Sequence, residues 1–592
     1  MKNILRLTKY AFKYKKSLVL AIFAMLAQVF VGFYIPFIMK DIIDVALPAH
    51  DFNTVAILSL SMLALALLGI ACGFLNTYTS QYISQYASAE LRLDLFNKIQ
   101  TLSFKNIDTF KASRLITNAT NDIVRVQMYF TMMLRIVIRA PMMIVMGLFL
   151  AISTSIQLSQ VFFITMPLLA VSIVVIMLFA YPRFRKVQTA LDDLNNVVLE
   201  NANAPQVVKS FVSQPHESER FEDVNENYRA VNTSAETVMA FADPVINVIF
   251  NAGIALILFL GTYYFNLGPD NAPAFFTDEG LPRIGLLMAF NSYSQQILIG
   301  LMMFAMIMIF ISRAEVSAAR ITEVLDADVD LMNPDNPIIP RLSGDIRFEN
   351  VSFGYGDNAN LVLKNIDFHV EAGEKFGIIG STGSGKSTLV SLIPRLYDVK
   401  GGRILLDGLP LKDLDIPSVR SQIGFVTQQA IIFSGSVATN ILQGDEGADL
   451  EKLKASAKQA QIHDFLLGQE GYFNHLVQAK GANLSGGQKQ RVSMARALIK
   501  RPSILILDDV TSAVDTVTER KVLKTIDTLP NRPTMLCISQ KVSTVRRMDR
   551  IMVLDNHGEI DGIGTHEQLL ECSPVYREIV GSQVKTGGET HA

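Results

Sequence analysis

The sequence predicts an α-helical transmembrane domain with six spans, followed by an α/β domain built on a phosphate-binding P-loop. Half of the 592 residues are hydrophobic and the mean hydropathy is +0.30, as is typical of a chain with a membrane part. The apolar residues gather into long runs before residue 326, whereas β-branched strands alternate with helices after residue 342. A glycine-rich stretch with P-loop spacing follows one of these strands.

The amino-terminal residues 1–16 interleave apolar with basic side chains, which predicts an amphipathic helix on an anionic membrane surface. A signal peptide is the alternative explanation of a basic start before an apolar run. The run continues from Ser17 to about Met39, which is too long for a signal peptide and long enough to cross a bilayer. We therefore expect an interfacial helix and then a first span.

Long apolar segments mark the spans, each near or above the roughly 20 residues that cross a bilayer. The connections near 47–53, 152–158 and 266–281 contain no Lys or Arg, whereas those after the second and fourth spans are rich in both. By the positive-inside rule, the amino terminus and the two basic connections face the cytosol. The six predicted spans lie at about 17–39, 54–75, 129–152, 158–181, 240–265 and 282–312.

The two cytosolic connections are far longer than a turn requires, and they keep a helical alternation of apolar and charged residues. We expect the spans to continue as helices beyond the bilayer, with tips at 106–114 and 203–210 that contact a cytosolic domain. Residues 1–325 therefore form the predicted transmembrane domain. Aspartates and prolines at 326–341 are typical of a linker, after which the α/β domain occupies 342–583 and a polar tail occupies 584–592.

The charge and cysteine content exclude two classes of function. The 53 Lys and Arg residues nearly balance the 55 Asp and Glu residues, and no local basic patch is evident, so no nucleic-acid partner is expected. Cys72, Cys537 and Cys572 are scattered without a CxxC pair, and they indicate neither a zinc site nor a disulfide framework.

The segment 380–388 matches GxxxxGK[ST] between an apolar strand and a helix, which is the context that a P-loop requires. Its glycines permit a tight turn whose backbone N–H groups point at phosphate oxygens at the helix start. Lys386 is predicted to reach the β- and γ-phosphates, and Ser387 is predicted to bind Mg²⁺. The predicted nucleotide-binding residues of the loop are Gly380, Ser381, Thr382, Gly383, Ser384, Gly385, Lys386, Ser387 and Thr388.

Asp508 is a second residue predicted to lie beside the phosphates. It ends the apolar run 504–508, a pattern that predicts a buried strand. In the same sheet as the P-loop, this carboxylate is predicted to hold Mg²⁺ through water. A solvated aspartate at a strand end is the alternative.

Between these motifs lies the signature, Leu484, Ser485, Gly486, Gly487 and Gln488, which opens a helix and offers N–H and hydroxyl donors to an anion. A turn that only caps the helix is the alternative. With the P-loop, Asp508 and six spans ahead of them, the chain resembles an ABC exporter half-transporter over about residues 10–580. The resemblance implies binding of ATP and Mg²⁺, and head-to-tail pairing of two cassettes in which each signature caps the nucleotide of the other.

The resemblance assigns further positions. Tyr355 matches the aromatic residue that stacks on adenine, although a tyrosine packed in a core is the alternative. Gln428 matches the glutamine that binds Mg²⁺ and links the attacking water to the membrane domain. Residues 512–515 match a loop that crosses to the other cassette, and the tips 106–114 and 203–210 match the coupling helices.

Two catalytic positions depart from the family pattern. Asp509 stands where hydrolytic members have Glu, so its carboxylate is drawn back by roughly 1.5 Å, and an error of about 1 Å can cost about a hundredfold in rate. Gln540 stands where they have His, and an amide cannot carry the charge of an imidazole. Because Lys386, Ser387 and Asp508 are intact, the pattern predicts a site that binds Mg-ATP but hydrolyses it poorly.

This asymmetry is similar to that of heterodimeric ABC exporters. We therefore predict one half of a heterodimer in the cytoplasmic membrane, surrounded by membrane lipid, with its ATP-binding domain in the cytosol. It would export lipophilic compounds, as in multidrug efflux, and lend its signature to the competent site of a non-identical partner. Two alternatives remain open, namely a homodimeric lipid or peptide exporter and an ATP-binding regulatory subunit.

The membrane residues give only a hint of a substrate pocket. Arg135 and Arg139, in the cytosolic half of the third predicted span, are costly unless they face a wet cavity, and are candidates for its lining or gate. Methionines of the third and sixth spans suit a promiscuous pocket, although packing or lipid contact is their more ordinary role. These methionines are Met132, Met133, Met142, Met143, Met302, Met303, Met306 and Met308.

Overall fold

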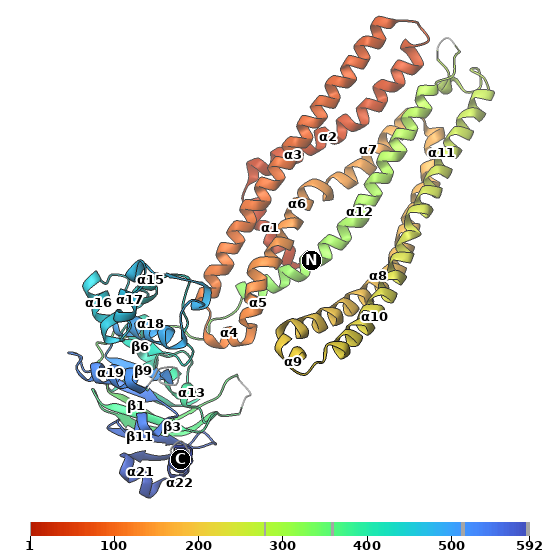
Figure 1. Cartoon of the computed structure of the whole chain (residues 1–592). Coiled ribbons are helices and arrows are strands. Elements are labelled where there is room, and N and C mark those ends of the chain that lie inside the picture. The colour runs from red at the N-terminus through yellow and green to blue at the C-terminus, as the bar shows by residue number, and fades with distance from the viewer. Residues whose placement is uncertain (1, 278–279, 357–359, 511–515, 588–592) are drawn as a thin grey trace. The chain divides into compact units, whose positions relative to one another are not determined.

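The computed structural model describes residues 2–277, 280–356, 360–510 and 516–587, except the side chains of residues 305, 306, 308, 309, 312, 516 and 584–587. The chain forms two compact units (Figure 1). The helical unit holds residues 1–100 and 113–326, and the α/β unit holds residues 101–112 and 327–592. The tip of the first cytosolic connection therefore belongs with the α/β unit.

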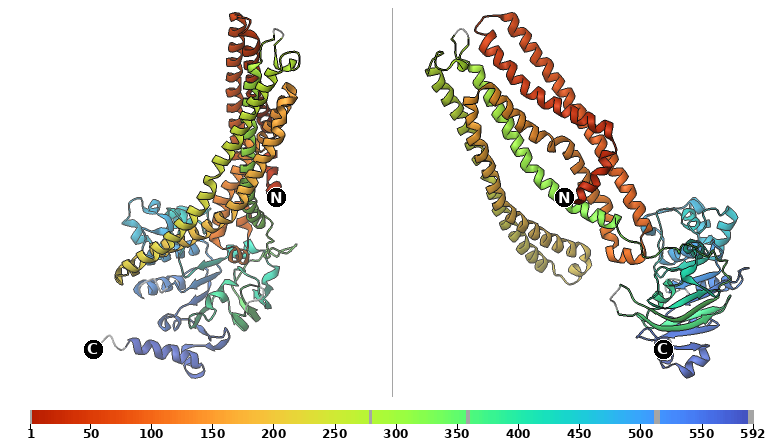
Figure 2. Two further views of the ribbon diagram at one scale, coloured as in Figure 1. Left: turned by 90° about the vertical axis from the view of Figure 1, so that its right-hand side faces the viewer. Right: turned by 180° about the vertical axis from the view of Figure 1, so that it is seen from behind.

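Long helices make up the helical unit. Figure 2 shows α8 and α10 lying side by side, joined by the short α9 at one end. The helices are α1 (Lys2–Phe12), α2 (Lys15–Asp41), α3 (Phe52–Thr101), α5 (Ala112–Thr117), α6 (Ile123–Met132), α7 (Arg139–Thr154), α8 (Ile156–Asn203), α9 (Pro205–Ser210), α10 (Gln214–Ala240), α11 (Ala242–Asn266) and α12 (Ile284–Leu325), with π-helical turns η1 (Ile42–Ala46), η2 (Asn118–Asp122) and η3 (Met133–Val137) and the 3-10 turn η4 (Pro273–Phe275).

Within the described residues, five helical segments are long and apolar enough to cross a membrane, and they coincide with the first five predicted spans. The sixth predicted span, 282–312, lies in α12, several of whose side chains fall outside the described set, so it remains a prediction. Helices α3 and α8 contain 50 and 48 residues, against about 20 for a bilayer crossing, which confirms that spans continue as long helices.

The amphipathic amino-terminal segment forms α1, as expected. Its apolar residues Ile4, Leu7 and Ala11 are buried, because α1 packs against α12. The backbone N–H groups of Asn3 and Ile4 donate to Glu315 of α12 at 3.2 and 3.0 Å. The face that we expected on lipid thus packs on protein, while its basic residues remain exposed.

Two π-helical turns present buried carboxylates to α12. Asp44 of η1 accepts hydrogen bonds from the backbone N–H groups of Gly285 and Leu286 at 2.6 and 3.0 Å. These groups open α12 and have no partner within the helix. Asp122 of η2 accepts a hydrogen bond from Arg320 at 2.8 Å, near the other end of α12. Helix α12 is therefore held by a carboxylate at each end.

The α/β unit contains a six-stranded sheet in the order β12-β11-β3-β10-β9-β6, which is parallel except at β12. A second, antiparallel sheet has the order β2-β1-β4-β5, and β7 pairs with β8. The strands are β1 (Ile346–Phe353), β2 (Leu363–Val370), β3 (Lys375–Gly380), β4 (Gly401–Leu406), β5 (Leu409–Pro410), β6 (Ile423–Val426), β7 (Gly435–Ser436), β8 (Leu476–Val477), β9 (Ile504–Asp508), β10 (Thr534–Ile538), β11 (Arg550–Leu554) and β12 (Ile560–Gly564).

Helices surround these sheets, and two apolar cores hold the unit together. One core contains Phe348 and Phe368 of the antiparallel sheet together with Phe376 and Ile506 of the parallel sheet. The other lies under α15, α16 and α18. The helices are α4 (Phe104–Phe110), α13 (Lys386–Ser391), α14 (Ile416–Ser421), α15 (Val437–Leu442), α16 (Leu450–Gln459), α17 (His463–Leu467), α18 (Gly486–Leu498), α19 (Thr516–Asp527), α20 (Val542–Val545), α21 (His566–Cys572) and α22 (Pro574–Gly587).

The predicted α/β fold is therefore confirmed, with a largely parallel sheet at its centre. The separate antiparallel sheet was not anticipated, because its strands show the same β-branched and alternating pattern as those of the parallel sheet.

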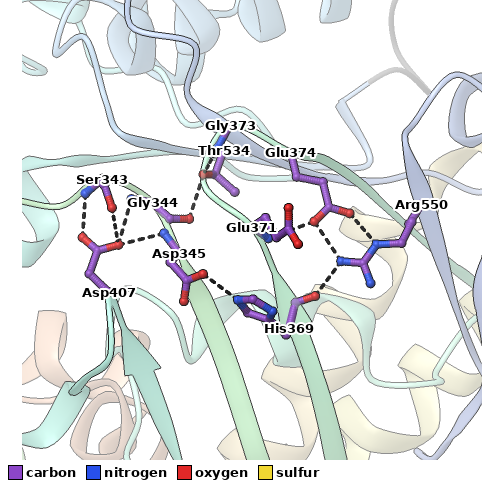
Figure 3. Close-up of polar contacts among 10 residues, drawn as sticks. All are labelled: Ser343, Gly344, Asp345, His369, Glu371, Gly373, Glu374, Asp407, Thr534 and Arg550. Atoms are coloured by element: carbon purple, nitrogen blue, oxygen red, sulfur yellow. Dashed lines mark hydrogen bonds and ion pairs between the residues drawn. The ribbon is translucent and has the colours of Figure 1, made fainter.

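A polar joint, shown in Figure 3, precedes β1 of the α/β unit. Asp407 accepts hydrogen bonds from the backbone N–H groups of Ser343, Gly344 and Asp345 at 2.6, 3.1 and 2.8 Å. Thr534 donates to the Gly344 carbonyl at 2.7 Å. Gly344 has φ +109°, and a Cβ there would lie 2.3 Å from Thr534 Oγ1, so only glycine fits this entry point.

Candidate nucleotide-binding site

The P-loop connects β3 to α13, which is the strand–turn–helix context that the motif requires. Gly385 is the N-cap of α13 and has φ +92°. Gly380 ends β3, and a Cβ at this position would lie 2.5 Å from the Leu554 carbonyl oxygen. Backbone conformation and close packing thus require glycine at these positions. The loop lies at the carboxyl edge of the parallel sheet.

Lys386 lies beneath the loop and is buried. Its Nζ donates to the carbonyl oxygens of Gly380 and Ser381 at 2.9 and 2.6 Å and to Ser384 Oγ at 3.2 Å. Burial lowers the pKa of Lys386, an effect that the nearby charges of Asp509 and Asp508 oppose. The loop therefore holds a desolvated cation beside two carboxylates.

Asp508 ends β9, one strand from β10 and two from β3. Ser387 Oγ donates to Asp508 Oδ1 at 3.0 Å. Burial raises the pKa of Asp508, and the charge of Asp509 raises it further, while Ser387 and Lys386 act in the opposite direction. The hydroxyl and the carboxylate together present oxygen donors of the kind that Mg²⁺ binds.

Asp509 adopts a left-handed backbone conformation, with φ +48°. Its N–H donates to the Ile538 carbonyl at 3.0 Å, and its carboxylate accepts a hydrogen bond from Gln428 Nε2 at 3.4 Å. Burial raises the pKa of Asp509, and the backbone N–H of Gln540 opposes this by bonding to the carboxylate. A non-glycine residue in this conformation is uncommon and tends to mark a functional position.

Gln540 follows β10, and its side chain is exposed. Its carbonyl accepts a hydrogen bond from Gln583 Nε2 at 2.6 Å, and Gln583 Oε1 accepts one from the Val542 N–H at 2.9 Å. Because Gln583 belongs to α22, this helix holds the loop that carries Gln540 from outside the site.

These residues surround one cavity of about 340 Å³. Val362 and Ile538 also contribute to its wall, although no sequence motif marks them. The role of each residue in nucleotide binding remains a prediction, but the structure brings most of the predicted residues together. The cavity is lined by Tyr355, Val362, Thr382, Gly383, Gly385, Lys386, Ser387, Thr388, Gln428, Asp508, Asp509, Ile538 and Gln540.

Tyr355 lies at the edge of this cavity and is 41% exposed, so it is not the core residue of the alternative explanation. Its hydroxyl and Thr388 Oγ1 are 2.9 Å apart. The rings of Phe353 and Tyr397 stand edge-on to it, with centroids 5.2 and 5.3 Å away. The tyrosine ring is therefore a partly exposed part of the cavity wall beside the P-loop.

The signature lies apart from this cavity, since none of Leu484 to Gln488 is among its described lining residues. Ser485 is the N-cap of α18, where its Oγ accepts from the Gln488 N–H at 3.3 Å and its own N–H donates to Gln488 Oε1 at 2.8 Å. Gly486 lines a second cavity of about 590 Å³ that shares Gln428 with the first. Gln490, to which the sequence assigns no role, is buried and donates to the Gln428 carbonyl at 2.5 Å.

The tip of the first cytosolic connection forms α4 and packs within the α/β unit, as predicted. Tyr397 donates to Asp108 of α4 at 2.9 Å, and the Phe104 and Tyr397 rings lie 5.9 Å apart. Asn106 donates to the Asp328 carbonyl at 3.2 Å. Because Tyr397 also contacts Tyr355, side-chain contacts run from α4 to the edge of the nucleotide cavity.

The other tip forms α9, where Val207 is exposed, as are Phe211 and Val212 directly after it. Its contact with a cytosolic domain remains a prediction. The predicted crossing loop, 512–515, lies outside the described residues.

Comparison with known proteins matches two parts of the chain to two family descriptions. Residues 18–302 match the family described as the ABC transporter transmembrane region, and residues 363–512 match the family described as ABC transporter. YfiB of Bacillus subtilis, an uncharacterized ABC transporter ATP-binding protein, is 37% identical over 564 residues, covering 95% of this chain and 96% of YfiB.

Two further matches extend over nearly the whole chain. An ATP-dependent lipid A-core flippase of Syntrophus aciditrophicus is 29% identical over 581 residues, covering 98% of this chain and 94% of the flippase. The solved structure of a bacterial Atm1-family ABC exporter with ATP bound has a TM-score of 0.78 and 24% identity, covering 96% of this chain and 98% of that chain. This last likeness shows the fold.

Proposed function

Because this chain belongs to the ABC transporter family, as a multi-pass membrane domain followed by an ATP-hydrolysing domain, we propose that it is one half of a heterodimeric exporter. In this proposal its own site binds Mg-ATP but hydrolyses it poorly, and its signature closes the competent site of a non-identical partner. The cargo is a set of lipophilic compounds, as in multidrug efflux.

The observation that carries the proposal is the contrast between intact binding residues and altered catalytic ones in a single cavity. Lys386, Ser387 and Asp508 keep the residue types that bind phosphate and Mg²⁺. Asp509 and Gln540 occupy the positions that activate water and sense the γ-phosphate. The shorter carboxylate and the uncharged amide weaken catalysis more than binding.

The residues present fit ATP and Mg²⁺. The oxygens of Ser387, Asp508 and Gln428 would hold the cation, and the P-loop amides and Lys386 would hold the phosphates. When bound, ATP supplies the γ-phosphate that water attacks. Asp509 is the carboxylate available to orient that water, and its side chain is one methylene shorter than the Glu of hydrolytic members.

The signature supports a role in trans. Ser485 is exposed at the start of α18, where its neighbours leave backbone N–H groups free of helical partners. Such a helix start binds anions. Since the signature is absent from the described wall of this chain's own nucleotide cavity, a partner's phosphate is its proposed ligand.

Orientation follows from the charge of the connections. The first and second cytosolic connections are rich in Lys and Arg, whereas the other connections lack both. We therefore assign the amino terminus and the ATP-binding domain to the cytosolic side of the cytoplasmic membrane.

A homodimeric lipid exporter is the second candidate, because one relative is named a lipid A-core flippase. That reading requires Asp509 to serve as the base in two identical sites. An ATP-binding regulatory subunit is a third candidate, for which nucleotide occupancy without substrate-dependent turnover is expected.

The deciding experiment isolates the full chain from its native membrane and identifies what co-purifies. We expect a second, non-identical half-transporter at equal stoichiometry, and little ATPase activity from the chain alone. A lone homodimer with full ATPase activity would overturn the proposal in favour of the homodimeric exporter. A stable complex with a protein of another kind would favour the regulatory subunit.

A further inference from the structure

Two arginines of the third predicted span have no partner among the residues that the structure describes. Arg135 lies in the π-helical turn η3, and Arg139 begins α7. Neither guanidinium forms an ion pair or a hydrogen bond with any residue that the structure describes, and Arg139 Nε is a buried donor with no acceptor. Arg135 is exposed and Arg139 is half-buried.

Acids on the neighbouring elements η2 and α12 are engaged elsewhere. Glu315 of α12 accepts hydrogen bonds from the start of α1, and Asp122 of η2 pairs with Arg320 at 2.8 Å. The α12 segment opposite α7 is apolar in sequence from Gly300 to Ile311. Gly300 itself packs closely on α7, because a Cβ there would lie 3.2 Å from the Ala140 carbonyl oxygen. The protein therefore supplies no counter-charge to the two arginines among its described residues.

Unpaired guanidinium groups at membrane depth are expensive, and in proteins they usually face water or bind a ligand. The planar fork of arginine binds carboxylate, sulfonate and phosphate groups with two parallel hydrogen bonds. The π-helical turn between α6 and α7 is itself a feature that often accompanies functional sites. An anion is thus the ligand that these two side chains suit.

Apolar, adaptable side chains lie next to the charges. Met142 is less than one turn beyond Arg139, and it packs with Met303 of α12 against the apolar core of the helical unit. Both methionines are half-buried, and Met302 is 40% exposed. Thioether side chains adapt to apolar groups of different shapes. The arginines at and just before the start of α7 are therefore next to an apolar surface that α7 and α12 form together.

We propose that Arg135 and Arg139 bind the anionic head of an amphipathic substrate whose apolar body lies against Met142 and Met303. The inference rests on the proposed export function and gives its substrate class: lipophilic compounds that carry a carboxylate, sulfonate or phosphate group.

The test uses the full chain with its co-purified partner in phosphatidylcholine nanodiscs. Two fluorescent probes share an aromatic body and differ in charge: 8-anilinonaphthalene-1-sulfonate carries an anion, and N-phenyl-1-naphthylamine is neutral. Binding of each is measured to wild type, to the double variant Arg135→Gln/Arg139→Gln and to the charge-conserving Arg135→Lys/Arg139→Lys. Arg185→Gln, an exposed arginine on α8, is the matched control. Assembly with the partner and ATP binding verify folding.

We expect the glutamine pair to weaken binding of the sulfonate probe by about tenfold or more and to change binding of the neutral probe by less than about twofold. The lysine pair should recover part of the affinity, and Arg185→Gln should resemble wild type. Equal sulfonate binding by wild type and the glutamine pair would overturn the inference, as would an equal loss for both probes.

The proposed function is tested separately by ATP-dependent uptake of each probe into inverted vesicles. If wild type takes up the neutral probe and the glutamine pair binds the sulfonate probe as well as wild type does, the export function stands and only the anion site is ruled out. No uptake of either probe by wild type counts against the export function itself. Repeating the binding assay with phosphatidylglycerol in the nanodisc identifies the source of the anionic ligand. If the lipid competes with the sulfonate probe, a membrane lipid occupies the site. If it does not compete, the site binds a non-lipid substrate.

Discussion

In the proposed heterodimer, Asp509 and Gln540 are the residues that make this chain's own site weakly hydrolytic. Restoring Asp509→Glu together with Gln540→His should raise ATP turnover of the assembled transporter, approaching about twice the original rate if both sites then work alike. Glu at position 509 places the carboxylate one methylene farther out than Asp509, whose carboxylate lies 3.4 Å from Gln428. His at position 540 adds an imidazole that can carry charge. Steady-state ATPase activity of the purified complex measures the gain, with Gln540→His alone as the control.

Flat turnover in that double variant, with ATP still bound, would place part of the defect in the partner's signature. The assignment of the weakness to these two residues would then be incomplete.

Asp508 provides a pH-dependent test of the same cavity. Burial raises its pKa above the usual value of 3.8, so the folded state binds a proton more readily than the unfolded state. Such a group favours the folded state below its unfolded pKa, and this contribution is lost as pH rises through the folded pKa. Asp508→Asn should therefore raise the thermal stability of the nucleotide-free chain near neutral pH, with a gain that shrinks toward about pH 4.

Thermal unfolding of the full chain across this pH range measures the effect. Asp464→Asn is the matched control, because the Asp464 side chain is 98% exposed. A stabilisation that does not depend on pH would show that charge burial at Asp508 is not its cause.

At the scale of elements, helix α12 depends on a carboxylate from a distant part of the sequence. Asp44 accepts hydrogen bonds from two N–H groups at the start of α12. Asp44→Ala should lower the free energy of unfolding by about 1–2 kcal/mol, as loss of a helix cap does, whereas Asp44→Asn keeps an acceptor oxygen and should cost less. Thermal unfolding in nanodiscs ranks the variants, and an alanine variant as stable as wild type would show that the cap contributes nothing.

Elements also show where the sequence is informative. The helical spans and the P-loop could be predicted because hydrophobic runs and motif spacing are local. The bond from Asp44 to Gly285 joins residues 241 positions apart, and no local pattern records it. The same holds for Tyr397 and Asp108, which connect α4 to the edge of the nucleotide cavity.

The sequence also could not reveal the π-helical turns, because one extra residue in a helical turn scarcely alters an apolar pattern. In the candidate site, Val362 and Gln490 escaped notice for a related reason. Each acquires its place only after strands and helices assemble around the P-loop.

At the scale of the whole molecule, paired cassettes predict that this chain's motifs serve different sites. In the proposed heterodimer, Lys386 serves this chain's own weak site, whereas Ser485 serves the competent site of the partner. Losing a donor to developing phosphate charge costs about 10² to 10³ in rate, so Ser485→Ala should nearly abolish ATPase activity. Lys386→Ala should weaken ATP retention but leave measurable turnover. Ser485→Thr, which keeps the hydroxyl and the helix cap, is the control.

Steady-state ATPase activity of equally assembled complexes makes the comparison. Equal damage from Lys386→Ala and Ser485→Ala would remove the functional asymmetry, and a symmetric homodimer would become the better account.

The hydrogen bond from Gln583 to the Gln540 carbonyl allows movement of the loop that carries Gln540 to be followed by spectroscopy. Cys572 is exposed at the end of α21, just ahead of α22, whereas Cys537 is buried, with a thiol pKa raised to about 12, and Cys72 is only half-exposed. Thiol reagents react with the thiolate, so a maleimide dye should attach first at Cys572. The fluorescence of a dye at Cys572 should change when α22 moves. Because the Gln583 amide joins α22 to the loop beside the nucleotide cavity, the dye should also report rearrangement of that loop, without any engineered cysteine.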